Sequence, residues 1–149
     1  MKNLYLDTCC FNRPFDDQTQ PRIRLESEAV KTILRLYEQK YWQVSISQAT
    51  LFEVNNIPNL SRKQKIKAIV HHIYAIIEIN DAIIQRAGYF TSCGLDAMDA
   101  THLASAENHA DILLTVDDKF IKKAKLIEDL NIKAENPLIW LGTLFYEFS

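Results

Sequence analysis

One helix-and-strand unit, residues 96–117, restricts the fold of this 149-residue chain more than any other stretch. Small apolar residues recur at helical spacing over residues 100–106, which predicts a helix that opens on two carboxylates. The apolar run 112–114 is too short for a helix and is typical of a buried parallel strand. This strand leads to Asp117, and ligands of open parallel sheets bind beyond the carboxyl ends of the strands.

Short apolar runs alternate with helical patterns along the rest of the chain. Strands are predicted at residues 4–6, 43–46, 76–79, 112–114 and 131–134, and helices at 21–39, 48–55, 61–73, 81–92, 96–106, 118–125 and 138–148. Residues 8–18, interrupted by Pro14, are predicted to be a loop. The alternation predicts an α/β fold, a three-layer α/β/α sandwich with a mainly parallel central sheet. No repeat or linker divides the chain, so one domain is expected over residues 1–149.

Composition limits what such a domain binds. Hydrophobic residues make up 48% of the chain and charged residues 24%, which suits one globular core. The net charge of −2 excludes a strongly basic surface, so nucleic-acid binding must come from local features. The three cysteines lack the spacing of zinc or redox motifs, which favours reduced thiols and a cytoplasmic location. No signal peptide or long apolar run is recognisable, so no membrane association is expected.

Four carboxylates have corresponding positions in this predicted sheet. Asp7 and Asp117 follow strands, Glu53 lies on the helix after the second strand, and Asp99 opens the helix before the fourth strand. If they converge at one edge, their charges repel strongly unless a divalent cation neutralises them. Oxygen ligands suit Mg²⁺ or Mn²⁺, and such an ion can bind a phosphodiester and activate a water molecule. The pattern indicates a metal-dependent nuclease.

Each acid also has a purely structural explanation. Asp7 could accept hydrogen bonds from a turn, Asp117 could cap the helix that begins at residue 118, and Glu53 could be a solvated helix residue. Asp99 lies three residues after Asp96, so the two could be a helix cap and the third helical position. Asp96 could instead be a fifth acid of the site. The convergence of four separate segments favours the functional explanation.

The motifs LYLDT (4–8), LFE (51–53), DATHLASA (99–106) and LLTVD (113–117) resemble those of the PIN-domain family, as does NPL (136–138). The resemblance implies the PIN fold and ribonuclease activity that depends on Mg²⁺ or Mn²⁺, with catalytic and metal-binding roles for Asp7, Glu53, Asp99 and Asp117. It also assigns Thr115 a supporting hydrogen bond. Many small members resemble VapC toxins, which an antitoxin protein neutralises and which often form homodimers.

Several residues depart from the family pattern or have open roles. Cys9 stands where the family often has Asn or Ser, and the 12–18 segment is longer than a minimal member needs. Arg13 and Arg22 could hold RNA phosphates, although Arg22 could equally be a solvated helix charge. His102 lies one turn after Asp99 and is expected to pack beside the site or to support it rather than to act directly.

Two function classes follow from this pattern. The first is an endoribonuclease that hydrolyses RNA phosphodiester bonds as the toxin of a type II toxin–antitoxin pair. The second is a catalytically inactive PIN-like module that binds RNA or protein. The intact set of four acids favours the first, because a retired site has no physical reason to retain mutually repelling carboxylates. A dehalogenase-type phosphatase needs a second Asp where this chain has Cys9, and a dinucleotide-binding domain needs a Gly-rich first turn that is missing.

Overall fold

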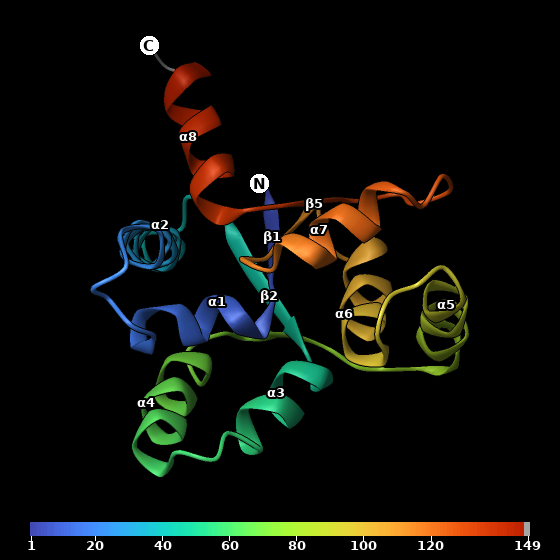
Figure 1. Ribbon diagram of the computed structural model, residues 1–149, viewed down its shortest axis with the longest axis horizontal. Coiled ribbons are helices and arrows are strands. Elements are labelled where there is room, and N and C mark those ends of the chain that lie inside the picture. Colours follow the sequence, from blue (N-terminus) through green and yellow to red (C-terminus); the bar gives the residue numbers. More distant parts are fainter. Residues whose placement is uncertain (148–149) are drawn as a thin grey trace.

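Five parallel strands form one sheet in a computed structural model that describes residues 1–147, and their side chains as far as residue 145 (Figure 1). The strand order is β3-β2-β1-β4-β5, so β1 lies in the centre. The strands are β1 (Asn3–Leu6), β2 (Gln43–Ser47), β3 (Ala75–Ile77), β4 (Ile112–Leu114) and β5 (Lys133–Glu135). Leu4 pairs with Val44 on one side and Ile112 on the other, as the buried apolar runs require.

Helices cover both faces of the sheet and give the predicted three-layer α/β/α sandwich. The helical elements are α1 (Thr8–Asn12), the 3₁₀ turn η1 (Arg13–Phe15), α2 (Pro21–Glu38), α3 (Gln48–Asn55), α4 (Leu60–Val70), α5 (Asp81–Ser92), α6 (Ala97–Glu107), α7 (Asp118–Lys125) and α8 (Pro137–Glu147). Leu4 and Leu6 point into a core with α1, α2, α4 and α8, whereas Tyr5 points into a second core with α5, α6 and α7. Figure 1 shows these two groups of helices on opposite sides of the strands.

The predicted loop at residues 8–18 was wrong over its first half. Thr8–Asn12 forms α1, and Arg13–Phe15 forms a 3₁₀ turn that accommodates Pro14 near its start. Tertiary contacts stabilise these short turns, because Cys10 and Phe11 are buried in the core. Five residues are too few to show helical periodicity, so the polar composition suggested a loop.

Smaller differences concern element boundaries. Strand β5 lies about two residues after its predicted position, and β3 begins one residue before it. The predicted end of the last helix, Phe148, lies outside the described residues. Within residues 1–147, no helix is both long enough and apolar enough to cross a bilayer.

The cap of α4 is Asn59, two residues before the predicted start of this helix at residue 61, since Asn59 Oδ1 accepts a hydrogen bond from Arg62 N at 2.9 Å. We expect Asn59→Ala to lower the free energy of unfolding by about 1 kcal/mol, the usual cost of losing a capping side chain. Ser61→Ala is the matched control and should cost much less. Urea unfolding of both variants tests this, and equal losses would contradict the assignment of the cap.

Candidate active site

The four predicted acids all lie beyond the carboxyl ends of neighbouring strands. Asp7 directly follows β1, Asp117 follows β4 and begins α7, and Glu53 lies in α3, directly after β2. Asp99 lies in the first turn of α6. Figure 1 shows α1 and α3 starting from the same end of β1 and β2, because the strands are parallel.

Three of these segments bring helix N-termini to the site. Asp7 caps α1, Asp117 caps α7 through bonds from Lys119 N and Phe120 N, and Asp96 caps α6 through Asp99 N. The same acids therefore cap helices and lie close together. The partial positive charge at each helix N-terminus offsets part of the repulsion between their carboxylates. Asp117 accepts both of these bonds at Oδ1, so the cap occupies only one of its two oxygens.

Asp7 is buried and held by several donors. Thr8 N donates to Oδ1 at 2.8 Å, and the Thr115 hydroxyl donates to Oδ2 at 2.7 Å. The Cys9 thiol donates to Oδ2 at 3.3 Å, so it occupies the orienting position of the family's Asn or Ser. The hydrogen bond with Cys10, burial and the Asp7 charge raise the pKa of Cys9 well above its usual value, which keeps the thiol protonated as a donor.

Asp99 shows that the acids interact electrostatically. Its pKa is raised to about 7, first by burial and then by the charges of Asp7, Asp96 and Asp117. A carboxyl group with this pKa is only partly ionised at neutral pH. The charges of Asp7, Asp96 and Asp117 therefore act on Asp99, and neighbouring carboxylates of this kind favour a divalent cation.

Glu53 and His102 form the second half of the site. Glu53 Oε1 accepts hydrogen bonds from Thr8 Oγ1 at 2.6 Å and from His102 Nε2 at 2.5 Å. Burial alone raises the pKa of Glu53, but these two groups outweigh burial and the pKa is lowered. Burial lowers the pKa of His102, yet Tyr5, Glu53 and Asp7 together raise it well above its usual value.

The donor set fits a divalent cation. Asp7, Glu53 and His102 each offer an atom within 4.8 Å of the others, and Asp99 and Asp117 add carboxylates nearby. Within residues 1–147, no Lys or Arg forms an ion pair with any of the four acids. His102 lies 3.6 Å from Asp7 and 2.5 Å from Glu53 and offsets part of their charge, and the remaining carboxylate oxygens are ligands that Mg²⁺ and Mn²⁺ prefer.

Comparison with known families decides the classification, because residues 4–126 match the PIN domain family. The chain belongs to the PIN-domain family. PIN domains are generally nucleases, and those nucleases usually use divalent metal ions. No curated protein matches this PIN domain in sequence.

Solved structures of other proteins share the fold of this PIN domain. FitAcB from Neisseria gonorrhoeae aligns with a TM-score of 0.60 at 19% identity, over 90% of this chain and 97% of that chain. VapBC2 from Rickettsia felis, bound to a promoter DNA fragment, gives 0.60 at 18%, over 89% and 98%. DNA-bound VapBC from Salmonella typhimurium gives 0.60 at 14%, over 90% and 98%. At these identities the likeness shows the fold.

The arginines considered as phosphate ligands are engaged in ion pairs of this PIN domain. Arg13 pairs with Asp16 at 3.1 Å and with the buried Glu26 at 3.2 Å. Arg22 pairs with Glu26 at 3.2 Å and, through two nitrogens, with Asp118 at 2.7 and 2.8 Å. The Arg22 side chain is 58% exposed, so it remains accessible beside the acidic site, whereas Arg13 is mainly structural.

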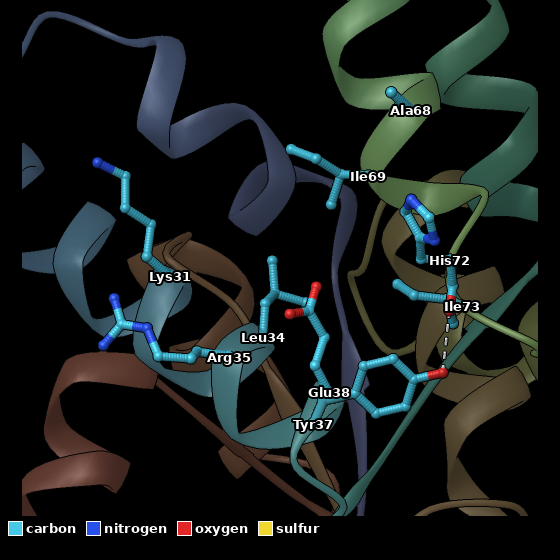
Figure 2. A pocket seen from close by; sticks show the side chains of 9 residues that line it. All are labelled: Lys31, Leu34, Arg35, Tyr37, Glu38, Ala68, Ile69, His72 and Ile73. Carbon is cyan, nitrogen blue, oxygen red and sulfur yellow. Dashed lines mark hydrogen bonds between the residues drawn. The ribbon is translucent and has the colours of Figure 1, made fainter.

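A separate groove lies between α2 and α4 (Figure 2). Its cavity of about 410 Å³ is lined by apolar side chains that include Leu34, Ile69 and Ile73, with Lys31 and Arg35 also on its wall. A hydrogen bond from Tyr37 Oη to the His72 carbonyl oxygen joins α2 to the turn that follows α4. None of the four acids lines this groove, so it is a second surface with different chemistry.

Proposed function

We propose that this PIN domain is a metal-dependent endoribonuclease and the toxin of a type II toxin–antitoxin pair. The observation that carries the proposal is the cluster of Asp7 and Glu53 beside His102, whose ligand atoms lie within 4.8 Å of one another in a chain that matches the PIN domain family. A site that gathers these carboxylates, with His102 rather than a Lys or Arg as their charged neighbour, suits a hard divalent ion. Binding RNA as a substrate, rather than DNA, rests on the family resemblance.

Different residues of this chain would bind the metal ion, orient Asp7 and contact the RNA. Asp7, Glu53, Asp99 and Asp117 would hold Mg²⁺ or Mn²⁺, and the bound ion would supply an activated water and stabilise the leaving oxygen. Thr115 and Cys9 keep Asp7 in one orientation through hydrogen bonds to Oδ2. Arg22, exposed and close to Asp117 through its partner Asp118, is the accessible cation for an RNA phosphate.

Cation binding can be measured before any substrate is known. We expect Mn²⁺ or Mg²⁺ to raise the melting temperature by about 5–10 °C at a hundred times the dissociation constant, because a ligand of the folded state then adds about 2.7 kcal/mol. Differential scanning calorimetry of the metal-free protein tests this. Absence of a shift at millimolar ion would instead favour the catalytically inactive PIN-like module.

The proposal includes a protein partner, since solved structures of similar fold are FitAcB and VapBC assemblies. The α2–α4 groove suits an apolar segment, given its apolar lining, and acidic side chains on that segment are favoured because Lys31 and Arg35 outnumber Glu38 on the wall. We place the antitoxin there, and the toxin as a homodimer in the cytoplasm, where its three free cysteines stay reduced.

If the antitoxin binds at the α2–α4 groove, a substitution there should prevent neutralisation without affecting RNA cleavage. Ile69→Arg puts a charge on the apolar lining, so we expect it to abolish neutralisation by the antitoxin while RNA cleavage is kept. The test co-expresses the toxin with the product of a small neighbouring gene and scores growth. Lys119→Ala, an exposed charge on α7, is the control, and neutralisation of Ile69→Arg at the wild-type level would contradict this placement.

A further inference from the structure

A chain of buried polar side chains connects the sheet to Glu53. Tyr5 Oη lies 2.7 Å from Ser47 Oγ and 2.6 Å from His102 Nδ1. His102 Nε2 then lies 2.5 Å from Glu53 Oε1. The side chains of Tyr5, Ser47 and His102 are buried, so bulk water does not compete for the hydrogen bonds among these three residues. Burying these polar side chains costs free energy unless each of them is hydrogen-bonded, so their geometry is well defined.

The hydrogen-bond partners determine the role of the imidazole. An ionised carboxylate only accepts, so Nε2 must donate to Glu53. Ser47 Oγ accepts from Ala49 N at 3.2 Å and has its own proton for Tyr5, which in turn donates to Nδ1. If the imidazole is doubly protonated, Tyr5 accepts instead and Nε2 still donates. In both cases Nε2 has no lone pair for a cation.

The two donors to Glu53 both use the same oxygen. Thr8 Oγ1 and His102 Nε2 converge on Oε1, and within residues 1–147 no hydrogen bond is formed by Oε2. The Glu53 side chain is 32% exposed, and a free glutamate there would sample several rotamers. Holding one oxygen fixes the rotamer and leaves the other oxygen free for coordination.

We propose that His102 is a positioning residue of the cation site: supported by Tyr5, it fixes Glu53 through Oε1 and leaves Oε2 to the ion. His102 touches neither the cation nor RNA. This inference rests on the proposed function, because it assigns Glu53 to a divalent ion. Substitution of a residue that orients a metal-binding carboxylate typically weakens metal affinity by about 10- to 100-fold.

The test measures Mn²⁺ affinity of the full chain by electron paramagnetic resonance of the free ion. We expect His102→Leu to weaken Mn²⁺ binding by about 10- to 100-fold. Tyr5→Phe should weaken it less, because the imidazole of His102 then loses only its hydrogen bond with Tyr5 Oη. His102→Gln keeps an amide donor at a similar position and should stay close to wild type. His71→Gln, exposed on the far end of α4, is the matched control.

Pulsed electron paramagnetic resonance of bound Mn²⁺ distinguishes orientation from coordination. We expect no directly bound nitrogen, and a nitrogen signal that His102→Gln removes would overturn the inference. Unchanged affinity in a folded His102→Leu protein would also overturn it, and if that variant does not fold, unchanged affinity in Tyr5→Phe does so. If the wild-type protein binds no Mn²⁺, the proposed function is overturned as well. If the wild type binds Mn²⁺ and the variants bind it equally tightly, only the role of His102 is rejected.

Discussion

Asp7→Asn is expected to reduce RNA cleavage by about a hundredfold or more while the protein stays folded. The variant removes the charge of the most buried acid of the site. A bound metal ion stabilises the transition state by several kcal/mol, and each loss of about 1.4 kcal/mol lowers the rate tenfold. Asparagine has the same shape, keeps an acceptor for Thr8 N, and faces a Thr115 hydroxyl that can turn to accept. The fold should therefore survive.

Single-turnover cleavage of an RNA pool in the presence of Mn²⁺ measures this loss, and circular dichroism monitors the fold. Asp81→Asn is the matched control, because Asp81 is an exposed acid in the first turn of α5, which follows the edge strand β3. Cleavage by Asp7→Asn at the control rate would remove Asp7 from the catalytic set.

Asp99→Asn is expected to make the metal-free protein more stable at pH 8, although it destroys part of the cation site. The pKa of Asp99 is raised from 3.8 to about 7 in the folded protein. The folded state therefore holds a proton that the unfolded state has released, and stability falls as the pH rises from about 4 through 7. Asparagine cannot ionise, so the variant lacks this loss and should equal the wild type near pH 4.

Thermal melts at pH 4, 6 and 8, compared as wild type minus variant, measure the effect separately from other titrating groups such as His102. Wild-type Mn²⁺ affinity should also tighten with pH, by about tenfold per unit below pH 7, as one proton leaves when the ion binds. Asp81→Asn again serves as control. A difference between wild type and Asp99→Asn that does not change with pH would show that Asp99 is ordinarily ionised.

The centre of the sheet was predictable because strands β1 and β4 are apolar on both faces. Runs such as residues 4–6 and 112–114 are typical of strands at the centre of a parallel sheet. Parallel strands place their carboxyl ends at one edge, so the approximate meeting of Asp7, Glu53 and Asp117 also followed from sequence. The roles of these acids remain predictions.

Other features depend on tertiary contacts that a single sequence does not encode locally. Helix α1 is too short to have periodicity and is stabilised by the burial of Phe11. His102 was expected beside the site, one turn after Asp99, but its bond to Glu53 depends on how α3 packs against α6. Glu26 resembles the other charges of α2 in sequence, yet it is buried between Arg13, Arg22 and Asn136.

The central claim is that carboxylates from separate segments form one divalent-cation site. Anomalous diffraction from crystals grown with Mn²⁺ tests this most directly, because it locates the ion without reference to activity. We predict a peak coordinated by carboxylate oxygens of the set Asp7, Glu53, Asp99 and Asp117, which disappears in Asp7→Asn. Saturating Mn²⁺ with no peak among these side chains, or a peak only elsewhere on the protein, would contradict the account.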